Sequence, residues 1–220
     1  MTIRGEEKVA VLCDFDGTAT LVDVTDTLYL EFGDEVCHAT LERWIKGEIT
    51  TPRELEICFS RMYPRKQEME AFIDTVPLDP GFADLVSLCR QRGYDFAVLS
   101  DGLRWYIDRI LERHGFDQLT VYANEIEFLE DGVELSFPWY DPGTPMRGTS
   151  KPSIVRRYQR EGCDVVFIGD GLSDTEVAGV ADVLYAKERL LDHCLEHDIP
   201  AASFANLEDV VENWQDPSGG

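Results

Sequence analysis

The amino-acid sequence predicts an α/β protein built on a Rossmann-like, doubly wound parallel sheet. Two observations support this fold class: short apolar runs end abruptly in polar or glycine-rich turns, and segments with helical periodicity lie between these runs. The chain has 220 residues, of which 44% are hydrophobic, and this length is sufficient to bury a sizeable core.

Five apolar runs have the near-continuous composition of strands that are buried on both faces of a parallel sheet. They are Val9–Cys13, Phe96–Leu99, Leu119–Tyr122, Val165–Ile168 and Val183–Ala186. Four segments between or after these runs space their apolar residues as a helix does. They are Phe82–Arg92, Trp105–His114, Ser153–Glu161 and Thr175–Ala181. The alternation predicts strands joined by crossover helices.

Two segments interrupt this alternation. Residues 22–76 contain no strong strand run but show helical periodicity around Leu41–Ile45 and Glu54–Met62. We therefore expect a small helical cap at 22–76, inserted after the first strand, and a catalytic core formed by 1–21 and 77–220. Residues Ile126–Phe137 alternate around a turn at Glu130–Gly132, which predicts a small hairpin.

The net charge of −23 makes nucleic acid and anionic membranes poor partners. Excess carboxylate also suggests a hypothesis of function in high salt, where self-repulsion is screened. No apolar segment of signal-peptide length follows Met1, and six dispersed cysteines include no CxxC pair. These features predict a cytoplasmic protein with reduced thiols. The oligomeric state is left open.

Polar side chains follow several of the predicted strands. Asp14-Phe15-Asp16-Gly17-Thr18 follows the first, Ser100-Asp101-Gly102 the second, and Gly169-Asp170-Gly171-Leu172-Ser173-Asp174 the fourth. Lys151 precedes the helix that starts near Ser153. Because ligands of open α/β sheets bind beyond the carboxyl ends of the strands, we expect these groups to meet at one edge of the sheet.

The carboxylates in these motifs are hard oxygen ligands of the kind that Mg²⁺ prefers. Asp14 and Asp16 are spaced i, i+2, so a pleated strand would turn both to one face. Carboxylates held together are costly unless a cation joins them. Asp14, Asp16 and Asp170 are therefore the predicted metal ligands.

The ordered set of motifs resembles the haloacid dehalogenase superfamily of phosphatases. Asp14–Thr18 matches its first motif, DxDGT, Ser100 the second, Lys151 the third, and Gly169-Asp170 with Asp174 the fourth. The resemblance implies a magnesium-dependent phosphatase that acts on a small phosphorylated metabolite.

The same resemblance implies a role for each matched residue. Asp14 would be the nucleophile that forms an aspartyl phosphate, and Asp16 the general acid and base. Asp14, the Asp16 backbone carbonyl and Asp170 would hold Mg²⁺. Ser100, nearby backbone N–H groups at Asp101 and Gly102, and Lys151 would bind the phosphoryl oxygens, while Asp174 would orient Lys151 or the water molecules of the metal.

The position of the helical insert is similar to the cap of the phosphoserine-phosphatase-like branch. Residues 151–206 also resemble the C-terminal half of the methionine-salvage phosphatases, which act on 2-hydroxy-3-keto-5-methylthiopentenyl-1-phosphate. Bacterial members of that group carry a cysteine-rich stretch before the motif-three lysine, and Tyr140–Ser150 has none. The candidate substrates are such an enol phosphate, phosphoserine or phosphoethanolamine.

Alternative interpretations are a phosphomutase and a non-catalytic phosphate-binding protein with the same fold. Ser100 could instead cap a helix, and Thr18 and Asp101 could be turn residues. His193 and His197 have a metal-ligand spacing, but their acidic surroundings favour a surface helix. The large cap side chains Trp44, Phe59, Met62 and Tyr63 fit a small core better than a pocket, and most of the cap arginines fit a solvated face.

Overall fold

The structure is a computed structural model that describes residues 8–215, so the first seven and last five residues of the predicted core segments lie outside the described residues. Within 8–215 one sheet has seven strands in the order β4-β3-β2-β1-β5-β6-β7. The strands are β1 Lys8–Cys13, β2 Asp95–Leu103, β3 Thr120–Leu129, β4 Gly132–Ser136, β5 Cys163–Gly169, β6 Val183–Ala186 and β7 Ala202–Ser203. All neighbours are parallel except β3 and β4. The predicted fold class is confirmed.

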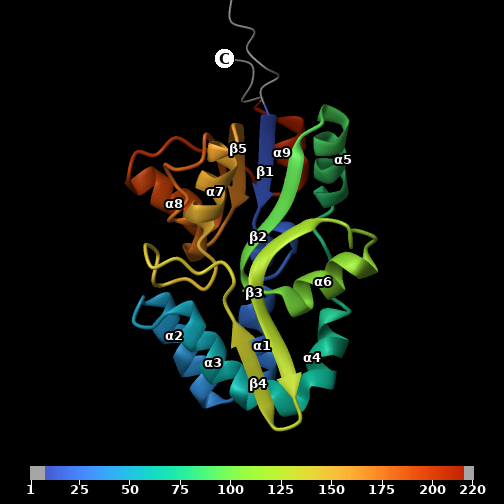
Figure 1. The fold of residues 1–220 in the computed structure, drawn as a ribbon, viewed down its shortest axis with the longest axis vertical. Coiled ribbons are helices and arrows are strands. Elements are labelled where there is room, and N and C mark those ends of the chain that lie inside the picture. The colour runs from blue at the N-terminus through green and yellow to red at the C-terminus, as the bar shows by residue number, and fades with distance from the viewer. Residues whose placement is uncertain (1–7, 216–220) are drawn as a thin grey trace, which may run out of the picture.

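Helices lie on both sides of this sheet and at one end of the molecule (Figure 1). They are α1 Val24–Phe32, α2 Glu35–Ile45, α3 Thr51–Met62, α4 Lys66–Ile73, α5 Phe82–Arg92, α6 Arg104–Arg113, α7 Lys151–Arg160, α8 Glu188–Glu196 and α9 Leu207–Glu212, with short 3-10 turns η2 Tyr63–Arg65 and η3 Leu172–Asp174.

One predicted helix is wrong. Residues 175–181 form consecutive turns after η3 rather than a helix. The carboxylate of Asp174 accepts hydrogen bonds from the backbone N–H groups of Asp170 and Gly171, which hold the chain in a tight loop. Gly179 then takes a left-handed conformation, with φ of 78°, which a continuing helix does not contain. Local hydrogen bonds therefore override the apolar spacing of this segment.

The side chains of β1 separate the core into two clusters, because successive strand residues point to opposite faces. Val9, Val11 and Cys13 belong to the cluster covered by α5, α6 and α9. Ala10 and Leu12 belong to the cluster covered by α7 and α8. Since both faces are buried, β1 is apolar throughout, which is the pattern that predicted it.

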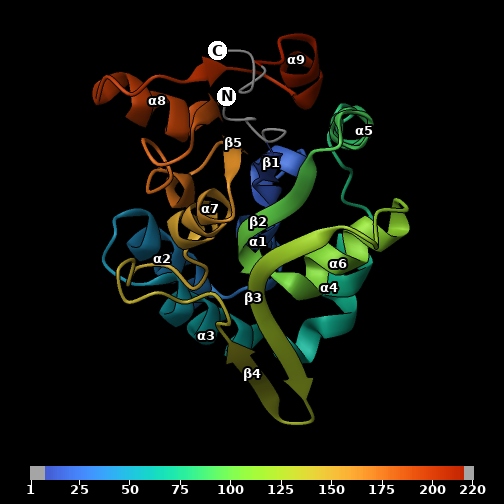
Figure 2. The same ribbon diagram turned by 45° about the horizontal axis from the view of Figure 1, so that its top comes forward.

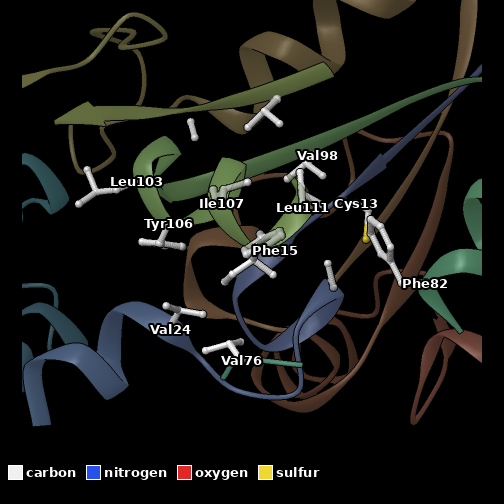
Figure 3. Packing of buried hydrophobic residues seen from close by; sticks show 14 of the residues in the cluster. Cys13, Phe15, Val24, Val76, Phe82, Val98, Leu103, Tyr106, Ile107 and Leu111 are labelled. Atoms are coloured by element: carbon white, nitrogen blue, oxygen red, sulfur yellow. The ribbon is translucent and has the colours of Figure 1, made fainter. Parts of the chain in front are cut away.

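Helices α1–α4 lie within residues 22–76, beyond the carboxyl ends of β1 and β2 (Figure 1). Asp23, Asp34 and Thr50 cap the amino ends of α1, α2 and α3 with side-chain oxygens. The first core cluster continues into these helices. Phe15 lies between the sheet residues and Val24 and Val76 of the insert (Figure 3). Residues 22–76 are therefore largely helical, and their core is continuous with that of the sheet.

The predicted hairpin is confirmed, and its first arm is the continuation of a core strand. β3 runs unbroken from its pairing with β2 into an antiparallel ladder with β4. The hairpin extends toward the insert helices in both views (Figures 1 and 2). There Phe128 of β3 packs against Trp105, with ring centroids 4.8 Å apart, and Lys66 of α4 lies over the Phe128 ring. The hairpin thus supports one side of the insert.

Among the described residues, none of the helices combines the length and the apolar character needed to cross a bilayer.

Candidate active site

The motif residues meet at one edge of the sheet because the strands that carry them are in close register. Cys13, the last residue of β1, pairs with Val98 of β2 and Ile168 of β5. The polar residues that follow these positions, Asp14 and Asp170 among them, therefore lie side by side. Lys151 reaches the same edge from the first turn of α7.

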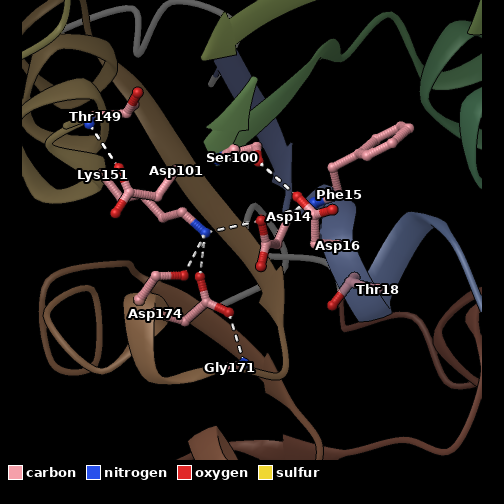
Figure 4. A network of polar contacts seen from close by, with 12 residues as sticks. Asp14, Phe15, Asp16, Thr18, Ser100, Asp101, Thr149, Lys151, Gly171 and Asp174 are labelled. Atoms are coloured by element: carbon pink, nitrogen blue, oxygen red, sulfur yellow. Dashed lines mark hydrogen bonds and ion pairs between the residues drawn. The ribbon is translucent and has the colours of Figure 1, made fainter. Parts of the chain in front are cut away.

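Lys151 is the centre of the arrangement (Figure 4). Its Nζ lies 2.8 Å from Asp14 Oδ1, 2.5 Å from Asp174 Oδ1 and 3.2 Å from Ser173 Oγ. Only 1% of its surface is exposed. Burial lowers the pKa of Lys151, but the charges of Asp14 and Asp174 outweigh burial, so the net pKa lies above its ordinary value. The ammonium group therefore remains charged inside the protein.

Asp14 follows β1 directly and is buried. Its Oδ1 accepts hydrogen bonds from the Phe15 backbone N–H, at 2.7 Å, and from Lys151. Its Oδ2 accepts no hydrogen bond from any residue in the described part of the chain. Burial raises the pKa of Asp14, and the neighbouring charge of Asp174 raises it further, while Lys151 lowers it. One oxygen is thus held in place and the other is left without a protein partner.

Asp14, Asp170 and Asp174 each place a carboxylate oxygen within 4.8 Å of the others. Burial and the charge of Asp174 raise the pKa of Asp170 to about 7. The Thr18 hydroxyl donates a hydrogen bond to Asp170 Oδ1, and a side chain on Gly17 would come within 2.7 Å of Asp170 Oδ2. Three carboxylates against one ammonium form an oxygen-rich donor set that suits a hard divalent cation.

Asp174 differs from the other two carboxylates because both of its oxygens already have protein partners. Oδ1 faces Lys151, and Oδ2 accepts the backbone N–H groups of Asp170, at 3.0 Å, and Gly171, at 2.9 Å. The geometry makes Asp174 a side chain that orients Lys151 and the loop after β5.

Asp16 does not lie on a pleated strand with Asp14, and that part of the prediction is wrong. β1 ends at Cys13, and residues 15–19 form a wide turn in which Gly17 has φ of 74°. The Asp16 carboxylate accepts hydrogen bonds from Tyr106 Oη at 2.7 Å, Ser100 Oγ at 3.1 Å and the Val24 backbone N–H at 3.1 Å. Burial raises the pKa of Asp16, and the hydrogen bonds from Tyr106 and Ser100 oppose this.

Ser100 and Gly102 complete the surroundings of Asp16. Ser100 does not cap α6, whose N-cap is Leu103; instead, its Oγ donates to Asp16 and accepts the Gly102 backbone N–H at 2.9 Å. A Cβ on Gly102 would lie 1.7 Å from Tyr106 Oη and 2.7 Å from Asp16 Oδ2. Only glycine at this position lets the tyrosine hydroxyl reach the aspartate.

Asp101 faces the helical insert rather than the other motif residues. Its Oδ2 accepts the Thr51 hydroxyl of α3 at 2.6 Å, and its Oδ1 accepts the backbone N–H groups of Gly148 and Thr149 at 2.9 and 2.8 Å. Because both oxygens are engaged, the carboxylate joins β2, the insert and the loop before α7.

These residues open onto a cleft of about 520 Å³. Asp14, Asp16, Ser100 and Asp170 line it together with residues of the insert and of the segments 187–189 and 205–206. The insert residues that line the cleft are Val22, Asp23, Thr25, Asp26, Trp44, Thr51, Glu54 and Leu55.

The large side chains of the insert and the two histidines near α8 differ in their distance from the cleft. Phe59 and Met62 are buried in the core, whereas Trp44 lines the cleft. His193 lies on α8 and His197 directly follows it, with ring centroids 4.2 Å apart and away from the cleft lining.

Sequence reasoning missed Tyr106, Thr51 and Glu54. Tyr106 lies within a helix that its periodicity predicts, and nothing local shows that its hydroxyl reaches Asp16. Glu54 reads as a solvated helix residue, yet only 3% of its surface is exposed. No single-sequence signal identifies these positions, because their partners come from other segments.

Comparison with known proteins gives consistent matches. The profile of the haloacid dehalogenase-like hydrolases matches residues 11–179. A 2-hydroxy-3-keto-5-methylthiopentenyl-1-phosphate phosphatase of Exiguobacterium sibiricum is 30% identical over 98% of this chain and 97% of its own. A protein of the same name from Brevibacillus brevis is 26% identical over 95% and 96%.

Solved structures of phosphoserine phosphatase have a similar fold. One, an analogue of the phospho-aspartyl intermediate, has a TM-score of 0.71 at 20% identity and covers 96% of this chain and 100% of its own. A substrate-bound complex has a TM-score of 0.70 at the same identity and coverage.

Proposed function

Because this chain belongs to the haloacid dehalogenase-like hydrolase family, we propose that its cleft is the active site of a phosphatase that transfers a phosphoryl group first to Asp14 and then to water. The observation that carries this proposal is the state of the Asp14 carboxylate. Lys151 and the Phe15 backbone N–H hold Oδ1, and Oδ2 has no partner among the described residues. A nucleophile needs this combination of fixed orientation and one available oxygen.

In the first step Asp14 Oδ2 attacks phosphorus in line with the ester oxygen. A bond forms between this carboxylate oxygen and phosphorus, and the bond from phosphorus to the ester oxygen breaks. The departing alkoxide takes a proton from Asp16, whose carboxyl group is oriented by Tyr106 and Ser100.

In the second step Asp16, now a carboxylate, takes a proton from water as the water oxygen attacks phosphorus. The bond between phosphorus and Asp14 breaks, and inorganic phosphate leaves. Asp14 is a carboxylate again, and Asp16 is protonated for the next cycle.

Lys151, the Ser100 hydroxyl and the backbone around Gly102 are the proposed contacts of the phosphoryl oxygens. Lys151 is buried, and Asp174 fixes its ammonium group. A charge held in place without bulk water stabilises the charge that develops on the transferring group. The Asp101 carboxylate is engaged elsewhere, so any phosphate contact at this position belongs to its backbone N–H.

Asp14, Asp170 and the backbone carbonyl of Asp16 are the proposed ligands of a Mg²⁺ ion. The donor set fits a divalent cation, because the three carboxylates carry more negative charge than the single Lys151 ammonium group can neutralise. When bound, the ion would supply positive charge to the phosphoryl oxygens and help to align them for attack. Thr18 keeps Asp170 turned toward this position through its hydrogen bond.

Residues 22–76 are proposed to act as a cap that selects the substrate. The chain enters and leaves this segment side by side, since Thr20 and Leu78 form an isolated antiparallel bridge. Insert side chains line the same cleft as Asp14. Together with the names of the relatives, this favours a small phosphorylated metabolite such as 2-hydroxy-3-keto-5-methylthiopentenyl-1-phosphate; phosphoserine and phosphoethanolamine are further candidates.

The test is the Asp14→Asn variant. With Mg²⁺ and p-nitrophenyl phosphate, we expect phosphate release to fall by at least about a thousandfold, because the amide is a poor nucleophile. Asp84→Asn, at an exposed position of α5, is the matched control and should retain activity. Brief acid quenching of the wild-type reaction should leave one phosphoryl group on the peptide that contains Asp14. Full turnover by Asp14→Asn, or turnover unaffected by removal of divalent metal, would contradict the proposal.

A further inference from the structure

Glu54 is a buried acid that faces the cleft without a protein partner. It lies in the first turn of α3, lines the cleft beside Leu55, and exposes 3% of its surface. Its carboxyl group makes no hydrogen bond or ion pair with any described residue. A buried polar group of this kind is costly unless something satisfies it, and the cleft is the direction from which a ligand can do so.

The surroundings of Glu54 favour its neutral form. Burial is the main cause that raises the pKa of its carboxyl group to about 9, and the carboxylates of Asp26, Asp101 and Asp23 add to this, while Arg147 opposes it. A protonated carboxyl group can donate a hydrogen bond, which a carboxylate cannot. Glu54 therefore presents a hydrogen-bond donor to the cleft near neutral pH.

The cleft has apolar lining residues besides its many polar ones. Leu55, Trp44 and Val22 line it, and Val22 is 38% exposed despite its apolar side chain. These side chains can contact an alkyl chain, and the carboxylates of Asp23, Asp26 and Asp101 near Glu54 disfavour a leaving group that places a carboxylate beside it.

We propose that Glu54 is a specificity-determining residue that donates a hydrogen bond to an uncharged oxygen, a carbonyl or enol, on the leaving group of the substrate. The proposal rests on the proposed phosphatase function and specifies the leaving group: an oxygen-bearing alkyl chain without a charge. The hydroxy and keto groups in the name of the similar phosphatases supply acceptors of this kind.

The experiment compares two probes that differ by one carbonyl group, hydroxyacetone phosphate and n-propyl phosphate. The wild-type ratio of their kcat/KM values is the reference, which removes the difference in intrinsic reactivity. Glu54→Met keeps the length of the side chain but loses the donor, and it should lower this ratio roughly tenfold. Glu54→Gln keeps a donor and should stay within about threefold of wild type.

Glu56→Gln is the matched control, because Glu56 is an exposed residue of the same helix. Activity of every variant on n-propyl phosphate shows that the reacting groups are intact. An unchanged ratio in Glu54→Met overturns the inference, as does an equal loss on both probes, which would make Glu54 a structural residue. Preference of the wild type for 2-aminoethyl phosphate, lost in Glu54→Gln, would show that Glu54 acts as an anion and would also overturn it.

The two proposals fail in different ways. If the wild-type protein with Mg²⁺ releases no phosphate from any probe, the phosphatase proposal fails and the role of Glu54 fails with it. If phosphate is released and Asp14 is labelled but the ratio does not depend on residue 54, only the inference about Glu54 fails.

Discussion

Asp16 owes its orientation to hydrogen bonds from three different segments. Tyr106 from α6 and Ser100 from β2 share one carboxylate oxygen, and the backbone N–H of Val24 in α1 binds the other. The proposed role of Asp16, to protonate a leaving group and then activate water, requires that its carboxyl group stay within hydrogen-bond reach of both. The single residue is therefore positioned by the sheet and by the insert together.

Replacing Tyr106 with Phe tests this positioning. The change removes the 2.7 Å hydrogen bond to Asp16 while it keeps the buried ring, so kcat should fall roughly tenfold and KM should change much less. The control is Tyr185→Phe, which removes a buried hydroxyl bonded to the Asn213 carbonyl on another part of the fold. Equal kcat in Tyr106→Phe and wild type would contradict this role.

The stability of the protein should depend on the ionisation of Glu54. The pKa of this acid is raised from 4.5 to about 9 by burial and by Asp26, Asp101 and Asp23, so the unfolded chain releases a proton that the folded chain keeps. The contribution of Glu54 to the stability of the wild-type protein is therefore fully present below pH 4.5. This contribution is lost progressively as the pH rises toward 9.

Glu54→Gln does not titrate, so its free energy of unfolding should exceed that of wild type by a margin that grows from about pH 4.5 to 9 and reaches about 1–3 kcal/mol at pH 7. Urea unfolding at a series of pH values measures this margin. A margin that stays constant across the range would mean that the acid is ionised in the folded protein.

At the scale of elements, Thr51 at the amino end of α3 ties the insert to the sheet through its hydrogen bonds. The Thr51 hydroxyl donates to Asp101 and accepts the Trp44 indole N–H at 3.0 Å, and its backbone N–H binds the Met146 carbonyl at 2.8 Å. Thr51 is the first residue of α3, and Glu54 lies one turn later, so this tie also sets the position of Glu54 over the cleft.

Thr51→Val keeps the shape of the side chain and removes the hydroxyl. An Asp101 oxygen and the Trp44 N–H then lose a buried partner, and we expect a loss of about 2 kcal/mol in the free energy of unfolding. The same substitution at Thr120, an exposed residue of β3, should change it by less than about 0.5 kcal/mol. Unfolding in urea compares the two variants. Equal stability of both would show that the tie contributes little.

At the scale of the whole molecule, a charge of −23 surrounds a site that is proposed to bind a phosphate anion. Long-range repulsion between the protein and its substrate is the consequence. The buried Lys151 and the proposed Mg²⁺ would act at short range, where screening by salt is weak, and so would hold the phosphate despite the acidic surface.

The same charge predicts that salt stabilises the fold. Raising KCl from about 0.01 to 1 M shortens the Debye length from about 30 to 3 Å, which screens repulsion between surface carboxylates. The unfolding temperature should therefore rise with KCl. Choline chloride at equal ionic strength is the control for screening as opposed to specific K⁺ binding. An unfolding temperature that stays level or falls would contradict the high-salt hypothesis.

Much of the fold follows from local sequence. Strand β1 reads as continuous apolar residues because both faces of the sheet are covered, and β6 and α5 coincide with the segments that their composition predicts. The meeting of the motif residues at one edge of the sheet also follows, because parallel strands bring their carboxyl ends to that edge. Asp14, Ser100, Lys151 and Asp170 could be placed there from the chain alone.

Tertiary structure alone decided the features whose energies come from contacts between distant segments. The turns at 175–181 replace a predicted helix because Asp174 binds Lys151 and the backbone of its own loop. Tyr106 is paired with Asp16 across 90 residues of chain, and Thr51 with Asp101 across 50. Periodicity indicates which face of a helix is buried, but only the packed fold determines what each side chain on that face contacts. The Glu54 side chain, for example, lines an open cleft.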